Sequence, residues 1–183
     1  CTHNPRPSYL RRVLDGLRQQ SLGTDNWELL IVDNASQPPL GEDLFPSWHP
    51  NARRMVEPLL GKTNAVLRGI EESSGDLLVI VDDDNVLAHD YLENATALSG
   101  RWPILGTWGG SIDADYEVSP PEWFSQYESY ISVRAIARDV WFNIDAPEMY
   151  GFIPYGAGLC VRRAVAQAYR RNVADHPVRR RLD

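Results

Sequence analysis

The chain has 183 residues, the size of one domain, and 43% of them are hydrophobic, which is enough for a substantial core. The formal net charge of −7 argues against a general nucleic-acid-binding protein. The two cysteines, Cys1 and Cys160, imply no disulfide framework, so a reducing, cytoplasmic compartment fits best, and no apolar run approaches the roughly 18–20 residues of a membrane span.

The first half of the chain alternates helical and extended patterns. The expected elements are, in order, a helix capped by Ser8 and running to Leu17, a buried strand over 27–32, a short strand around 54–56, a helix over 61–73 and a strand over 77–81. Strands that alternate with helices predict an α/β fold with a mostly parallel sheet.

The second half is less regular. The expected elements are a helix over 90–98, a strand over 105–112, an aromatic-rich helix from 120 to about 140, irregular chain over 141–155, a strand over 156–161 and a helix over 163–171. The opening CTHNP reads like a loop that follows a strand, and the chain has no initiator Met. We therefore expect a piece of a longer protein, trimmed at both ends.

Three consecutive carboxylates, Asp82–Asp84, directly follow the strand over 77–81. They repel one another, and hard oxygen ligands in a tight group suit Mg²⁺ or Mn²⁺, which commonly carry a phosphate or diphosphate. Asp33 ends an earlier strand, and parallel strands bring their carboxyl ends to one edge, so these acids are expected to face one crevice. The alternative is a solvated acidic loop.

Five segments in this order resemble the family 2 glycosyltransferases: CTHNP, LLIVDNAS, GDLLVIVDDDN, WGG and YGAGLCVRR. The resemblance implies the GT-A fold, a Rossmann-like, mostly parallel sheet sandwiched by helices. It implies one domain over 1–183, with a nucleotide-binding half over about 1–100 and an acceptor-binding half over about 101–183. The implied activity is inverting hexosyl transfer from a nucleotide-diphosphate sugar to a carbohydrate or lipid-linked hydroxyl, as in polysaccharide biosynthesis.

The resemblance also implies roles for individual residues. Asp84 matches the direct metal ligand, Asp82 the carboxylate beside the ribose and metal, and Asp83 assists either role. The other implied donor-site residues are Thr2, His3, Asn4, Asp33 and Lys62. The implied sugar and acceptor residues are Trp108, Gly109 and Gly110, with a bulge or turn as the alternative for the Gly pair and core packing for the Trp.

The sequence departs from the family at its carboxyl end. The family carries its catalytic base in an acidic pair downstream of the segment matching 156–161, but the acids after Val161 are only Asp175 and Asp183. The base is therefore expected beyond Asp183. Val66 also stands where many relatives carry Arg. These departures leave open a catalytically incomplete nucleotide-sugar-binding or regulatory module. An aspartate-pocket phosphohydrolase or receiver domain is disfavoured, because its acids would follow the first strand.

Arginines are frequent near the end of the chain, at 162, 163, 170, 171 and 179–181. A solvated helix face is the favoured interpretation. The alternative is contact with acidic lipid headgroups, which would place the protein peripherally at the inner face of the membrane.

Overall fold

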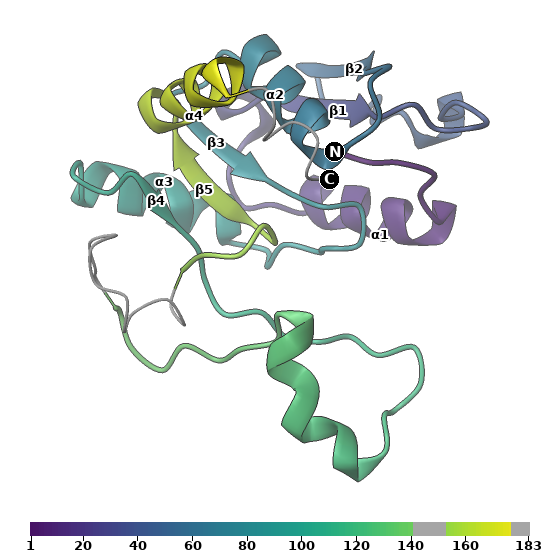
Figure 1. Cartoon of the computed structure of the whole chain (residues 1–183), viewed down its shortest axis with the longest axis vertical. Coiled ribbons are helices and arrows are strands. Elements are labelled where there is room, and N and C mark those ends of the chain that lie inside the picture. Colours follow the sequence, from purple (N-terminus) through teal and green to yellow (C-terminus); the bar gives the residue numbers. More distant parts are fainter. Residues whose placement is uncertain (141–152, 177–183) are drawn as a thin grey trace.

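The computed structural model describes residues 1–140 and 153–176 (Figure 1). Its α-helices are α1 (Pro7–Arg18), α2 (Lys62–Glu72), α3 (Tyr91–Arg101) and α4 (Arg163–Asp175), and its 3₁₀ segments are η1 (Thr24–Asn26), η2 (Glu42–Leu44) and η3 (Glu122–Ile131). The strands are β1 (Leu29–Asp33), β2 (Ala52–Val56), β3 (Leu77–Ile80), β4 (Thr107–Trp108) and β5 (Leu159–Arg162). The predicted α/β fold is confirmed.

The strands form two hydrogen-bonded groups. β1 pairs with β2 in parallel, from Leu29 opposite Ala52 to Asp33 opposite Val56. β5 lies between β3 and β4 and is antiparallel to both, so β3 and β4 run in the same direction. Antiparallel β5 is a feature that the alternation of helices and strands does not predict.

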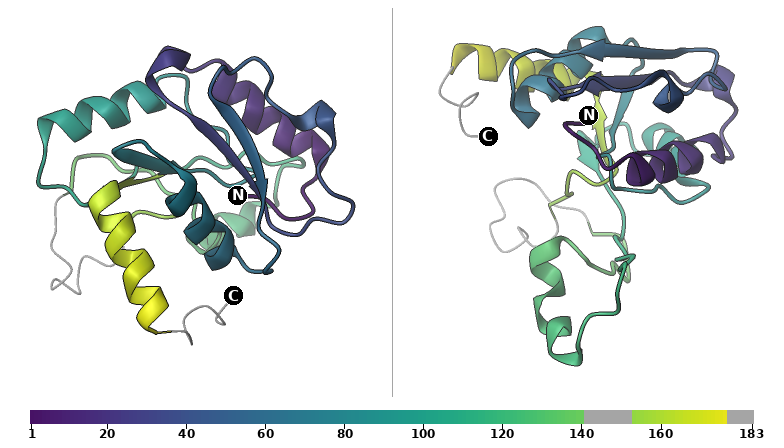
Figure 2. Two further views of the ribbon diagram at one scale, coloured as in Figure 1. Left: turned by 90° about the horizontal axis from the view of Figure 1, so that it is seen from above. Right: turned by 90° about the vertical axis from the view of Figure 1, so that its right-hand side faces the viewer.

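Helices cover both faces of the strands, with α2 and α4 on one face and α1 and α3 on the other (Figures 1 and 2). The side chains of β3 alternate accordingly. Leu78 and Ile80 pack in the cluster of α2 and α4, whereas Val79 packs against residues of α1 and α3. The predicted sandwich of sheet and helices thus follows from apolar residues on both faces of one strand.

The first helix begins two residues earlier than predicted, at Pro7 instead of Tyr9. Pro7 occupies the first turn, and Ser8 is exposed and makes no capping hydrogen bond. Proline suits this position because its fixed φ is helical and the N–H it lacks would have no partner in the helix. The predicted apolar face is confirmed, since Leu10, Val13 and two further leucines of α1 are buried.

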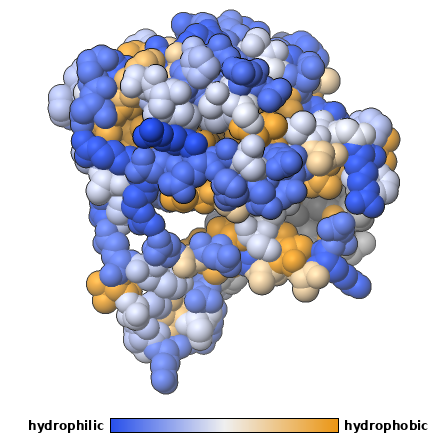
Figure 3. All heavy atoms as spheres, turned by 180° about the vertical axis from the view of Figure 1, so that it is seen from behind, coloured by the Kyte–Doolittle hydropathy of each residue, from blue (hydrophilic) through white to orange (hydrophobic). Residues whose placement is uncertain are grey.

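Between β4 and β5 the chain forms an arm that projects from the body of the molecule (Figure 1). It contains η3, which is shorter than the helix predicted over 120–140 and has 3₁₀ geometry. Most of the irregular stretch predicted over 141–155 lies outside the described residues. Seen from behind, the molecule is largely hydrophilic, with apolar side chains in small groups (Figure 3). No helix within 1–140 or 153–176 is long and apolar enough to cross a membrane.

The arginines at the start of α4 are structural. The guanidinium of Arg162 donates to the carbonyls of Leu105 (2.6 Å), Ser99 (2.7 Å) and Trp102 (3.0 Å). It also lies 5.5 Å from the ring centre of Trp108. Arg163 donates to the Gly75 carbonyl at 2.6 Å. For these two residues, the interpretation as a solvated face is wrong, because the end of α3 and the start of β3 each present carbonyls that need donors.

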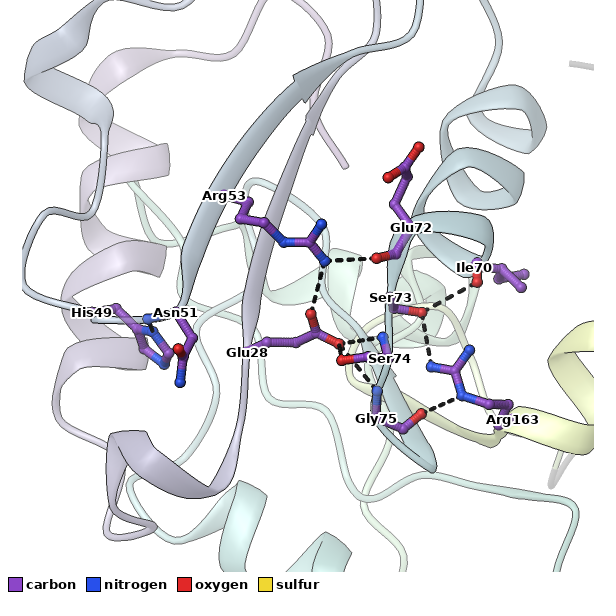
Figure 4. Close-up of polar contacts among 10 residues, drawn as sticks. All are labelled: Glu28, His49, Asn51, Arg53, Ile70, Glu72, Ser73, Ser74, Gly75 and Arg163. Atoms are coloured by element: carbon purple, nitrogen blue, oxygen red, sulfur yellow. Dashed lines mark hydrogen bonds and ion pairs between the residues drawn. The ribbon is translucent and has the colours of Figure 1, made fainter.

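A second polar contact joins β1 to the start of β3 (Figure 4). The Glu28 carboxylate, just before β1, accepts from the N–H groups of Ser74 (2.5 Å) and Gly75 (3.1 Å) and from Arg53 (3.0 Å). Burial by itself would raise the pKa of Glu28, but these hydrogen bonds outweigh it and lower the pKa to about 2. The ionised carboxylate therefore stabilises the fold.

We expect Glu28→Gln to lower the free energy of unfolding by about 1–2 kcal/mol at pH 7, after allowance for solvent screening. Because the folded pKa lies below the ordinary value of 4.5, the contribution is complete above pH 4.5 and is lost as the pH falls toward about 2. Urea unfolding of both proteins at several pH values measures the difference. Glu71→Gln, at an exposed ion pair with Arg170, is the control and should change little. A difference between wild type and Glu28→Gln that persists unchanged at pH 3 would contradict this account.

Candidate functional site

The three consecutive carboxylates Asp82–Asp84 lie where β3 ends, beside the opening loop of the chain. The N–H of Thr2 donates to the Val32 carbonyl at 3.0 Å, and the Thr2 carbonyl accepts from the N–H of Asn34 at 2.8 Å. Thr2 therefore pairs with the end of β1, while its hydroxyl donates to Asp83. The ends of β1 and β3 thus meet across the opening loop.

Asp82 is held in an ion pair. Lys62, the first residue of α2, places Nζ 2.8 and 2.9 Å from the two carboxylate oxygens of Asp82. A Cβ atom on Gly156 would lie 3.5 Å from that Nζ and 3.7 Å from an Asp82 oxygen. The loop before β5 therefore passes directly beside the ion pair. The sequence does not predict this position of Gly156. Lys62 offsets one of the three negative charges.

Of the three carboxylates, Asp84 is the one whose negative charge is least balanced by neighbouring groups. It is exposed and lies on the side of a polar cleft. Partial removal from water, followed by the charges of Asp83 and Asp82, raises the pKa of Asp84 above its ordinary value. A bound cation would reverse this effect, because it favours the ionised form.

The cleft beside Asp84 has a volume of about 350 Å³. Its lining residues are His3, Asn4, Pro5, Arg6, Tyr9, Asp83 and Asp84. Two of these lining residues bind the arm, since Arg6 (3.3 Å) and the Tyr9 hydroxyl both donate to Glu117. Arg6 and Tyr9 were missed as site residues by sequence reasoning, although they directly follow the predicted loop over 2–4.

His3 and Asn4 belong to a hydrogen-bonded loop. His3 Nδ1 donates to the Asn34 carbonyl at 2.6 Å, because a carbonyl can only accept. The Asn4 Oδ1 atom accepts from the N–H of Gln37 at 2.7 Å, and Asn4 has a φ of 45°. Asparagine tolerates this left-handed conformation better than most residues. The opening loop is thereby fixed to the loop after β1.

Asp33 points away from the cleft. It is 2% exposed, and its two oxygens accept from the N–H groups of Ser36 (3.0 Å) and Leu40 (3.3 Å). The neighbouring Asn34 bridges loops, since its Nδ2 donates to the carbonyls of Glu57 (3.0 Å) and Leu59 (2.7 Å). Both side chains shape the loops around the site, and neither role can be inferred from position in the sequence.

The predicted acceptor residues lie in packed surroundings. Trp108 is 8% exposed and packs with Ala95 and Cys160, so its ring faces the core. A Cβ atom on Gly109 would come within 3.2 Å of Pro154. The glycine therefore allows close approach of another chain segment, which is the alternative to close approach of a ligand.

The described residues include no group of three His, Cys, Asp or Glu side chains that could hold a metal ion alone. Mg²⁺ does not require such a group, because it commonly uses one or two carboxylates together with substrate phosphates and water. Asp84 provides one exposed carboxylate, and the buried Oδ1 of Asn85 has no hydrogen-bond partner among the described residues. The exposed carboxylate of Asp84 at the cleft fits a divalent ion that is shared with a phosphate ligand.

Solved structures with a similar fold are glycosyltransferases. A mannosyltransferase from Pyrobaculum calidifontis, in complex with GDP-Man and Mn²⁺, is 25% identical with a TM-score of 0.50 and matches 62% of this chain. TarS 1–349 from S. aureus has a TM-score of 0.63 at 16% identity over 92% of this chain, and its UDP-GlcNAc complex a TM-score of 0.53 at 17% over 66%. The chain spans 34%, 47% and 35% of these proteins. No curated protein matches its sequence.

The sequence model for Glycosyl transferase family 2 matches residues 1–155. This range includes the opening loop, the ends of β1 and β3, Lys62 and the three carboxylates. The match covers most of the sequence and agrees with the fold of the similar structures. The chain therefore belongs to glycosyl transferase family 2.

Proposed function

We propose that this chain is the donor-binding part of a metal-dependent, inverting glycosyltransferase. The enzyme moves a sugar from a nucleotide-diphosphate sugar to a hydroxyl acceptor. The observation that carries the proposal is the polar cleft of about 350 Å³ that the opening loop shares with Asp83 and Asp84. The neighbouring Asp82 forms an ion pair with Lys62. Membership of glycosyl transferase family 2 supports this reaction class.

In this proposal each acid has a different task. Asp84 ligates the divalent ion, because it is the exposed carboxylate of the three. Asp82 is oriented by its ion pair with Lys62, and Asp83 positions the opening loop through the Thr2 hydroxyl. When bound, Mg²⁺ or Mn²⁺ supplies Lewis-acid stabilisation of the charge that develops on a diphosphate leaving group.

The opening loop forms one wall of the nucleotide pocket. His3 and Asn4 line the cleft directly. The Asp33 carboxylate accepts hydrogen bonds from the backbone N–H groups of Ser36 and Leu40, and in this way it fixes the loop after β1. The complex of the Pyrobaculum calidifontis mannosyltransferase with GDP-Man and Mn²⁺ supports a guanine-nucleotide donor with Mn²⁺, and the UDP-GlcNAc complex of TarS makes UDP the second nucleotide to test.

Calorimetric titration of the chain with GDP and UDP tests the proposal. We expect binding in the presence of Mn²⁺ that weakens at least tenfold in EDTA, because the diphosphate would then meet three acids without a bridging cation. GMP, which lacks the second phosphate, is the control ligand, and its affinity should depend little on Mn²⁺. Equal affinities with Mn²⁺ and with EDTA would contradict the proposal.

A second candidate is a module that binds the donor without turnover. It is favoured by α4, whose only carboxylate, Asp175, lies at the end of the helix, so that the described segment after β5 provides no acidic pair. Incubation with GDP-mannose and Mn²⁺ distinguishes the two. Release of GDP in the presence of a sugar alcohol supports transfer, whereas binding without release supports the module.

A further inference from the structure

Arg6 carries the one permanent positive charge among the described residues that line the polar cleft. Its guanidinium donates to the Glu117 carboxylate at 3.3 Å and to the Tyr9 hydroxyl at 3.1 Å. It also lies 5.1 Å from the centre of the Tyr9 ring, and Tyr9 in turn donates to the same carboxylate. The cation of the cleft is thus paired with a carboxylate of the arm.

The ion pair between Arg6 and Glu117 is exposed, since 69% and 63% of the two side chains are accessible to solvent. Exposed ion pairs contribute little to stability, because water screens the charges and two long side chains must be ordered. Arg6 can therefore exchange Glu117 for another anion at a low cost in free energy. A guanidinium suits this exchange, because its planar fork of N–H groups matches carboxylates and phosphates alike.

The charges of the cleft leave a diphosphate in need of such a cation. Asp83 and Asp84 are the acids among the described lining residues. One divalent ion would balance these two carboxylates, and the charge of a bound diphosphate would remain without a partner. Arg6 lines the same cleft and can supply the missing positive charge.

We propose that Arg6 changes its partner from Glu117 to the diphosphate when the donor binds. This inference rests on the proposed function, because it takes the diphosphate to lie in the cleft beside Asp84. Glu117 is then an internal competitor that weakens donor binding, and donor binding removes one of the contacts that hold the arm. The two effects are reciprocal, since each site changes the affinity of the other by the same factor.

A second ion pair provides a matched control. Arg12 of α1 donates to Asp115 of the arm, and both side chains are exposed. This pair joins the same two segments of the chain as the pair of Arg6 and Glu117. Neither Arg12 nor Asp115 is among the described residues that line the cleft. Breaking this pair therefore loosens the arm without changing the cation of the cleft.

Calorimetry with Mn²⁺ and GDP or UDP, whichever the wild type binds more tightly, tests the exchange. We expect Arg6→Gln to weaken nucleotide binding about tenfold, because one charge-assisted hydrogen bond is lost. Glu117→Gln should tighten binding about two- to fivefold, because the competing carboxylate is gone. The same substitution in the Arg6→Gln background should leave the affinity unchanged, and so should Asp115→Asn in the wild type.

The change of partner can also be observed directly by NMR with the same nucleotide and Mg²⁺. At saturating nucleotide, the backbone amide of Glu117 should shift in the wild type and stay in place in Arg6→Gln. Circular dichroism of each variant verifies that it is folded, and none of the substituted side chains is buried.

An unchanged nucleotide affinity in Arg6→Gln would overturn this proposal and leave the donor site intact. Equal tightening by Glu117→Gln in both backgrounds would also overturn it, because the gain would then come from a general loss of negative charge. So would equal tightening by Asp115→Asn, because the cause would then be a looser arm. If the folded wild type showed no Mn²⁺-dependent binding of either nucleotide, the proposed function would be contradicted and this proposal overturned with it.

Discussion

Asp84→Asn is expected to weaken Mn²⁺-dependent binding of GDP or UDP about 100-fold or more. The substitution keeps the size of the side chain but removes the negative charge of the exposed carboxylate that would ligate the ion. Asp76→Asn is the matched control, because Asp76 is an exposed acid beside the opposite end of β3. Calorimetry of the three proteins with Mn²⁺ measures the effect, and equal losses in both variants would contradict a specific role for Asp84.

The same variant should fold at least as well as the wild type without metal. Burial and the charges of Asp83 and Asp82 raise the pKa of Asp84, so the ionised carboxylate is disfavoured in the folded state. Removing its charge therefore relieves repulsion above the ordinary pKa. Thermal unfolding in EDTA checks this point, and a lower Tm for Asp84→Asn would mean that lost binding reflects lost structure.

Arg162→Leu is expected to lower the free energy of unfolding by about 3–5 kcal/mol. The guanidinium donates to the carbonyls of Leu105, Ser99 and Trp102, and these acceptors would lose a charged donor. Arg162→Lys should recover only part of the loss, because one ammonium group cannot reproduce the planar fork of donors. Urea unfolding at pH 7 measures each variant.

Arg171→Leu provides the matched control for that experiment. Arg171 is an exposed residue of α4, and its replacement should change stability by no more than about 0.5 kcal/mol. If Arg162→Leu were equally mild, the contacts between Arg162 and the end of α3 would not be important for the fold.

Local pattern was sufficient for most of the secondary structure. The apolar run over 77–81 ends in three acids, and the strand and its acidic end both lie where this pattern places them. The helical face of α1 was equally predictable, because its apolar residues repeat with the period of a helix. The predictions for 105–112 and 120–140 were longer than the observed elements, because composition there did not show where the arm leaves the body.

The sequence by itself determined the α/β class, the family and the position of Asp82–Asp84 at the end of a strand, since these depend on the order of neighbouring residues. The tertiary structure alone decided which side chains are exposed to a ligand and which are packed inside the protein. The Asp33 carboxylate binds a backbone N–H group of the loop that follows it, and Trp108 is packed in the core. Gly156 lies beside the ion pair of Lys62 and Asp82. The physical reason is that these environments are formed by segments far apart in the chain, and a local pattern carries no information about which distant backbone group or side chain will be the neighbour.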